Sequence, residues 1–175
     1  ASPQEGWLSS GIKSIHISPM CWNGWSPLKD NLVIIILGFE EIRDWSLLDK
    51  FSADLTWLFV TSPGSKLEWN IYCEEYNKRL LKEIPPKGKV PALAPIKVSE
   101  VLSNCVTEEI AERYNIFISP LGTKPQILGA LYLITSSHIP INIVTTTVED
   151  HNVPYYSWDI GDTFEFFFPT RGYSP

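Results

Sequence analysis

The chain has few cysteines, and they are too far apart to build a covalent or metal framework. Its 175 residues contain three, Cys21, Cys73 and Cys105. An odd number of widely separated cysteines fits neither a disulfide scaffold nor the short ligand spacing of a zinc site. We therefore expect reduced thiols in a cytoplasmic protein, with no metal and no cofactor.

Long hydrophobic runs are also missing. A helix that crosses a bilayer needs roughly 20 consecutive apolar residues, and no run in the sequence approaches that length. The N-terminus lacks the basic segment followed by an apolar one that marks a signal peptide. We expect no contact with a membrane. The chain starts with Ala1 and not with Met, so processing, or excision from a longer protein, stays open.

Positive charge is in short supply. The chain has 14 Lys and Arg residues against 20 Asp and Glu, a formal net charge of -6. Duplex nucleic acid is bound through broad basic surfaces, so the composition disfavours this class of partner and leaves room only for a local basic pocket. With 44% hydrophobic and 13% aromatic residues, the chain can bury a full core in one domain.

Several motifs that define enzymes and nucleotide-binding proteins are absent from the sequence. It has no Gly-x-Gly-x-x-Gly after its first apolar run, no P-loop, no Gly-x-Ser-x-Gly and no His-Glu-x-x-His. The three histidines, His16, His138 and His151, lie outside the predicted strand-end loops. Histidine-based catalysis is therefore disfavoured, and we name no catalytic residue.

Apolar runs alternate with helical patterns through the middle of the chain. Residues 31–37 form a continuous apolar run of the kind found in a strand buried on both faces. Further strands are predicted at 55–60, at 90–98 as an edge strand, at 116–118 and at 139–146. Helices are predicted over about ten residues after Gly38, over 67–84, from a cap at Ser99 or Ser103 to Tyr114, and from Pro125 onward.

This alternation predicts βαβ units and a parallel sheet. We expect a Rossmann-like three-layer α/β/α sandwich with a mainly parallel sheet, whose five strands, numbered along the chain, lie in the order 3-2-1-4-5. Residues 1–30 are expected to be an irregular aromatic arm, and residues 31–175 the Rossmann-like ligand-binding domain, with a strand or hairpin at 158–168. Gly129 would let the helix after Pro125 approach the sheet closely.

Three loops would converge where the strand order reverses. At such a switch point, the carboxyl ends of strands and the N-termini of helices form a crevice for ligands. Hydroxyls, backbone amides and the cations Lys66 and Lys124 suit an anion such as phosphate better than they suit proton transfer. The candidate ligand-binding residues are Gly38, Phe39, Ser62, Gly64, Ser65, Ser119, Gly122, Thr123 and Lys124. The alternative is an ordinary turn, in which Thr123 caps a helix and Lys124 is a solvated charge.

The apolar strand, the loop that ends in Gly122-Thr123-Lys124 and the apolar helix after it resemble the ligand loop of CARF domains, the CRISPR-associated Rossmann-fold sensors. The likeness covers this short motif and the βα order of residues 31–146. The resemblance implies that Gly122, Thr123 and Lys124, and more weakly Ser119, bind a phosphorylated or cyclic nucleotide. It also implies a homodimer that controls an effector domain or subunit in antiviral defence.

Two other functions stay open. One is a metal-independent ring nuclease, in which Lys124 and nearby hydroxyls position a ribose 2′-hydroxyl and stabilise the charge of the transition state. The other is a structural domain that docks a second protein through its aromatic arm. Either the arm or the segment after the fifth predicted strand, at 139–146, would help to build a homodimer interface, or both would fold back over the subunit's own sheet. The aromatic residues concerned are Trp7, Trp22, Trp25, Tyr155, Tyr156 and Trp158.

Overall fold

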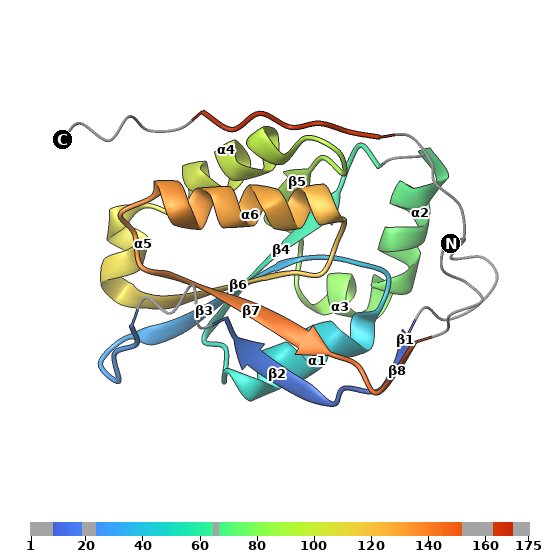
Figure 1. Cartoon of the computed structure of the whole chain (residues 1–175). Coiled ribbons are helices and arrows are strands. Elements are labelled where there is room, and N and C mark those ends of the chain that lie inside the picture. Colours follow the sequence, from blue (N-terminus) through green and yellow to red (C-terminus); the bar gives the residue numbers. More distant parts are fainter. Residues whose placement is uncertain (1–8, 19–23, 65–66, 152–162, 170–175) are drawn as a thin grey trace.

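The computed structural model of the chain describes residues 9–18, 24–64, 67–151 and 163–169. A six-stranded sheet forms its middle layer (Figure 1). Across the sheet the strands are β2 (Ser14–Ile17), β7 (Ile141–Thr147), β6 (Tyr114–Pro120), β3 (Asp30–Ile36), β4 (Leu55–Thr61) and β5 (Gly88–Val90). The pairing of β2 with β7 is antiparallel, and the other pairings in this sheet are parallel.

Strand β3 lies in the interior of the sheet because its side chains are apolar on both faces. Leu32, Ile34 and Ile36 point into one hydrophobic cluster, while Val33 and Ile35 point into the other. The strand pairs in parallel with β4 on one side and with β6 on the other. The predicted parallel pairing of residues 31–37 with residues 116–118 is therefore confirmed.

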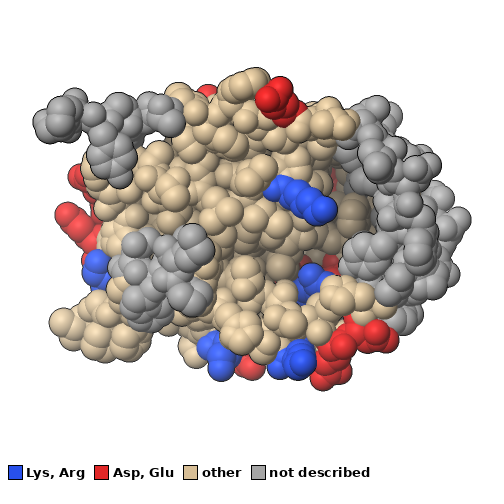
Figure 2. All heavy atoms as spheres, viewed as in Figure 1, with Lys and Arg blue, Asp and Glu red and all other residues tan. Residues whose placement is uncertain are grey.

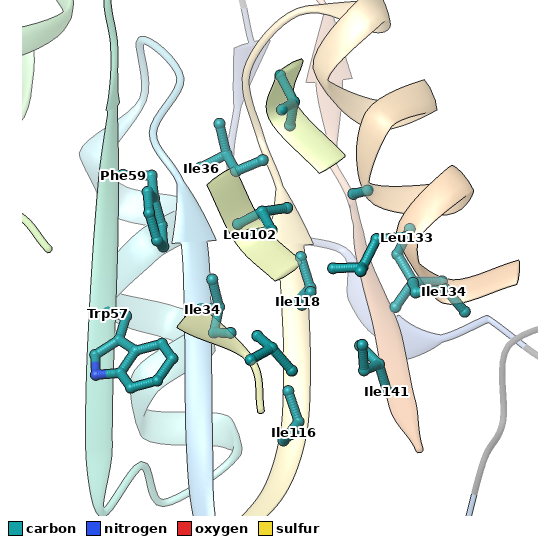
Figure 3. Packing of buried hydrophobic residues seen from close by; sticks show 14 of the residues in the cluster. Ile34, Ile36, Trp57, Phe59, Leu102, Ile116, Ile118, Leu133, Ile134 and Ile141 are labelled. Atoms are coloured by element: carbon teal, nitrogen blue, oxygen red, sulfur yellow. The ribbon is translucent and has the colours of Figure 1, made fainter. Parts of the chain in front are cut away.

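Helices cover both faces of the sheet, which makes the protein α/β with a mostly parallel sheet, as the sequence predicted. The core on one face is drawn in Figure 3, where isoleucines and aromatic side chains of the strands meet Leu102, Leu133 and Ile134 of the helices. That face carries α4 (Pro95–Cys105), α5 (Glu108–Arg113) and α6 (Lys124–Ser136). The other face carries α1 (Glu41–Lys50), α2 (Leu67–Tyr76) and α3 (Lys78–Glu83).

The outer surface on the α4 and α6 side carries few charges. Figure 2 shows mostly uncharged side chains over these helices, with most of the charged ones along the lower and left edges of the view and a few at the top and near the centre. Among the described residues, none of the helices combines the length and the apolar character needed to cross a membrane.

The predicted third strand at 90–98 is wrong beyond its first residue. Strand β5 ends at Val90, and Pro95 opens α4. A proline has no N–H to donate, which costs nothing in the first turn of a helix. The predicted helix from Ser99 or Ser103 to Tyr114 is wrong as well. It is two helices, the second capped by the Thr107 hydroxyl, and Tyr114 opens β6.

The predicted helix at 67–84 is also two helices, α2 and α3, which are separated at Asn77. The Asn77 side chain is fully buried and donates to the carbonyls of Gly38 and Cys73, each at 2.8 Å. This asparagine therefore ties the helix break to the turn that follows β3.

The expected irregular arm contains regular structure. Its residues 14–17 form β2, which extends the sheet as an antiparallel edge strand, with Ile15 and Ile17 packed on the α1 side of the core. In addition, β1 (Ser9–Ser10) pairs with β8 (Asp150–His151) in a separate antiparallel ribbon. The hydrophobic pattern of four residues was too short to predict a strand from the sequence.

The expected strand or hairpin at 158–168 falls partly outside the described residues. Its described part, from residue 163 on, contains no strand. This part runs along the outside of the helical layer (Figure 1). There the Tyr132 hydroxyl donates to the Pro169 carbonyl at 3.1 Å, and the Tyr132 and Phe168 rings lie 5.0 Å apart.

Gly129 lets α6 approach another helix, α4, closely. The predicted close approach was to the sheet. A Cβ atom at this position would lie 2.5 Å from the Pro95 carbonyl oxygen and 2.7 Å from Val98 Cβ. The missing side chain therefore sets the distance between α6 and α4.

Gly129→Leu should lower the free energy of unfolding by about 1–3 kcal/mol, because the added side chain forces the two helices apart. Denaturant unfolding followed by circular dichroism measures this change. Leu128→Ala, on the same helix at a side chain that is 40% exposed, is the control and should change stability by less than about 0.5 kcal/mol. Equal effects of the two substitutions would contradict the role given to Gly129.

Candidate functional site

A cavity of about 330 Å³ opens at the carboxyl ends of β3, β4 and β6. These strand ends flank the point where the strand order reverses between β3 and β6, the usual ligand position in open α/β sheets. Six of the residues predicted from the sequence line it, namely Gly38, Phe39, Gly64, Gly122, Thr123 and Lys124. The fold thus brings together three loops that are far apart in the chain.

Three predicted residues are not placed in the cavity wall. The Ser119 side chain is 1% exposed and donates to the Val144 carbonyl at 3.3 Å, so its hydroxyl is used between strands. The Ser62 amide donates to the Val90 carbonyl at 2.8 Å, which holds the loop against β5. Ser65 lies outside the described residues.

Two glycines in the wall leave room for groups that a side chain would displace. A Cβ atom on Gly38 would lie 2.2 Å from the Leu121 carbonyl oxygen, so a larger residue there would push the loops after β3 and β6 apart. A Cβ atom on Gly122 would lie 1.9 Å from Gln126 Oε1, so a larger residue there would displace the oxygen that accepts from the Thr123 amide.

Hydrogen bonds to α6 and to two neighbouring loops hold the loop from Leu121 to Lys124 in place. Thr123 is the N-cap of α6, as the alternative reading of this turn expected, and its amide donates to Gln126 Oε1 at 2.7 Å. The Thr123 hydroxyl donates to the Ala92 carbonyl, while Gln126 Nε2 donates to Thr61 Oγ1 at 3.0 Å. Because these bonds occupy the polar groups of Thr123, the exposed side chain of Lys124 is the group of this loop best placed to contact a ligand.

An ion pair that the sequence analysis missed also lines the cavity. Glu40 and Arg43, one turn apart at the start of α1, form a salt bridge with side chains 16% and 20% exposed. Ser9 joins them: its amide donates to Glu40 Oε1 at 2.7 Å, its hydroxyl to Glu40 Oε2 at 2.8 Å, and Arg43 donates to that hydroxyl. The opposite charges at positions i and i+3 after β3 were a sequence signal for this ion pair. Nothing in the sequence indicated that Ser9 would contact it.

Two acidic groups at or near the cavity have raised pKa values, Asp44 on α1 and Cys73 in the cavity wall. Asp44 is 1% exposed, and neither carboxyl oxygen has a hydrogen-bond partner among the described residues. Burial, and then the charge of Glu41, raise the pKa of Asp44 well above its usual range, against a smaller opposing effect of Arg43. Burial likewise raises the pKa of the Cys73 thiol, to about 11. Cys73 lines the cavity as an uncharged thiol, so it is not a reactive nucleophile at neutral pH.

The chemistry of the wall suits binding of an anion. Its charged side chains within the described part of the chain are Glu40, Arg43 and Lys124, and the rest of the wall is glycine, aliphatic, aromatic or neutral polar. No cluster of three or more His, Cys, Asp or Glu side chains is placed to hold a metal ion among these described residues.

A smaller cavity of about 190 Å³ lies at the amino ends of β6 and β7. Asn115 in its wall is 6% exposed and donates to the Ser26 and Lys29 carbonyls at 2.9 and 3.1 Å, while it accepts from the Ser26 amide at 2.9 Å. The asparagine therefore holds the turn before β3 and leaves little polar capacity for a ligand.

The sequence does not match any of the models of known protein families, and no curated protein matches it with significance. The functional argument therefore depends on the cavity and on the residues that line it.

Asp44→Asn tests the buried carboxyl. Because the pKa of Asp44 is raised in the folded state, the folded protein keeps a proton that the unfolded chain releases above its usual pKa of 3.8. The stability that Asp44 contributes is full below that value and falls as pH rises toward the folded pKa. Asparagine does not titrate, so the melting temperature of the variant should gain on that of the wild type as pH rises above about 4.

The control for this measurement is Asp49→Asn, at an exposed position of the same helix. It removes the same kind of group from an exposed site, so the pH dependence that Asp44→Asn shows in excess of this control belongs to the buried carboxyl. No excess over the control would show that this carboxyl is charged in the folded protein.

Proposed function

We propose that the chain is a CARF-like ligand-sensing domain that binds a phosphorylated or cyclic nucleotide in the cavity at the carboxyl ends of β3, β4 and β6. The observation that carries the proposal is the convergence of Gly38, Gly64 and the Gly122-Thr123-Lys124 loop on this cavity. The resemblance to the CARF ligand loop supplies the class of ligand, and the cavity supplies a place for it.

The composition of the wall supports an anionic, partly aromatic ligand. Lys124 provides an exposed positive charge, and Arg43 adds a guanidinium group that is paired with Glu40. Phe39 provides an aromatic face of the kind on which bases stack. A volume of about 330 Å³ lies at the lower end of the range for small-molecule sites. One nucleotide unit fits such a volume better than a whole cyclic oligonucleotide does.

A larger cyclic ligand would therefore be shared between two copies of the chain. We propose a homodimer for this reason, with an effector domain or subunit that responds to the ligand in antiviral defence in the cytoplasm. Trp25, a predicted interface residue, is 52% exposed, but it lines the smaller cavity at the amino ends of β6 and β7 and so lies away from an interface that shares this ligand. Trp7, Trp22, Tyr155, Tyr156 and Trp158 lie outside the described residues. Sedimentation over a range of concentrations, with and without ligand, measures the assembly.

The ring-nuclease alternative has weaker support. It needs a hydroxyl or another polar group free to position the ribose 2′-hydroxyl, but Thr123 is bonded to Ala92, and Thr61 accepts a hydrogen bond from Gln126. Lys124 alone could stabilise charge but could not orient the attacking oxygen. The geometry thus favours binding over turnover.

Incubation with cyclic oligoadenylates of different ring sizes tests the proposal. We expect at least one of them to raise the melting temperature without being converted, as followed by chromatography of the nucleotide. Conversion would favour the nuclease. No shift and no conversion with any ring size would remove the nucleotide-binding proposal and favour a protein-docking domain.

Lys124→Ala should weaken the binding of that ligand by roughly 10- to 100-fold, the loss of one charge-assisted hydrogen bond worth about 1.5–3 kcal/mol. Stability should change little, because Lys124 is exposed and a cation at a helix N-terminus opposes the dipole. Lys50→Ala, at the other end of α1 from the cavity, is the matched control. Titration calorimetry measures both, and unchanged affinity in Lys124→Ala would exclude this lysine from the site.

A further inference from the structure

We propose that Ser9, Glu40 and Arg43 form a switch through which an anion in the cavity loosens the β1–β8 ribbon. The inference rests on the proposed function only in that the cavity binds an anion. It adds a way in which binding would be transmitted to the ends of the chain.

The Glu40 carboxylate occupies the place beside Arg43 that a bound anion would take. Of the positively charged side chains in the described wall, Lys124 is exposed, whereas Arg43 is neutralised by the Glu40 carboxylate. This ion pair is largely shielded from water, so the attraction between the two groups is stronger than in a surface pair. A phosphate group that approaches Arg43 must replace Glu40 or lie beside its negative charge.

Glu40 is also the anchor of the ribbon. Its two carboxylate oxygens accept from the amide and the hydroxyl of Ser9, and Arg43 donates to the same hydroxyl. Ser9 is 7% exposed, so these bonds are protected from water. The ribbon itself pairs only Ser9 with His151 and Ser10 with Asp150, and a two-stranded ribbon of this length is barely stable by itself. The Glu149 amide also donates to the Ser10 carbonyl at 3.2 Å, so the ribbon continues the pairing of β2 with β7, and the bonds to Glu40 hold its Ser9 end beside α1.

Binding and docking are consequently linked. An anion on Arg43 removes the counter-ion of Glu40 and places a like charge beside it, which disfavours the present position of the carboxylate. When Glu40 moves, Ser9 loses the acceptor of its amide and of its hydroxyl. By the reciprocity of linked equilibria, the docked ribbon opposes anion binding to the same extent as the anion opposes docking.

The ribbon is a suitable output because of where it lies in the chain. Residues 1–8 precede β1, and residues 152–162 follow β8. These segments contain Trp7, Tyr155, Tyr156 and Trp158, which the sequence predicts as interface residues. The ribbon therefore connects the cavity wall to the points of the chain at which both segments join it.

Hydrogen exchange of the Ser9 amide tests the switch, with inorganic phosphate as the probe and sodium chloride of equal ionic strength as the reference. In the wild type, saturating phosphate should accelerate exchange at Ser9 by about tenfold or more. The amides of the central strand β3 should not respond.

Glu40→Gln separates charge from hydrogen bonding. Glutamine keeps an oxygen that accepts from Ser9 but has no charge to hold Arg43 or to be repelled by phosphate. Phosphate should therefore bind this variant about tenfold more tightly than it binds the wild type and should no longer accelerate Ser9 exchange. Glu112→Gln, an exposed position on α5 with the same change of charge, should behave as the wild type does.

The outcomes distinguish the switch from the function on which it rests. Phosphate binding that Lys124→Ala weakens, with no change in Ser9 exchange, would overturn the switch and leave the anion site in place. Absence of phosphate binding would overturn both. Faster Ser9 exchange with phosphate, but no binding of any cyclic oligoadenylate, would support the switch and overturn the nucleotide as its ligand.

Discussion

Burial of β3 on both faces is the constraint on which the rest of the structure depends. Its residues from Leu32 to Leu37 are at most 1% exposed, and each fully buried aliphatic side chain contributes about 1.5–3 kcal/mol relative to exposure. A strand of this kind needs a neighbour on each side and a helical layer on each face. Strands β4 and β6 and the helices of both layers meet these needs, and together they place the strand ends beside one another at the cavity.

The sequence was informative where apolar residues stand next to one another. Residues 31–37, 55–60 and 116–118 are mainly apolar on both faces of a strand, and their pairing follows from burial and from the handedness of βαβ units. The pattern was ambiguous where prolines stood among apolar residues. The predicted edge strand at 90–98 includes Pro95, which is the first residue of a helix, because a missing N–H is acceptable both in an edge strand and in the first turn of a helix. Strand β2, with four residues, carried too little pattern to be recognised.

The sequence predicted which loops lie at the site, but not the directions of the side chains within them. Loops at the carboxyl ends of parallel strands must lie together, so Gly38, Gly64 and Lys124 could be assigned to one cavity before the structure was known. The direction of a hydroxyl inside such a loop is settled by tertiary hydrogen bonds, as the Ser119 bond to Val144 shows. The contact of Ser9 with Glu40 joins residues 31 positions apart through a short ribbon, and no local pattern encodes it.

Several features around the cavity cost stability, and their concentration in one place is informative. Asp44 is buried without a hydrogen-bond partner among the described residues, Cys73 is a buried thiol against the Gly38 carbonyl, and Glu40 and Arg43 are partly desolvated. Each would be less costly as a well-packed apolar residue. The opposite end of the sheet, by contrast, satisfies buried Asn115 with several hydrogen bonds. Because local departures from optimal packing tend to gather where a protein acts, this asymmetry supports the carboxyl end as the working end of the sheet independently of the resemblance of the Lys124 loop.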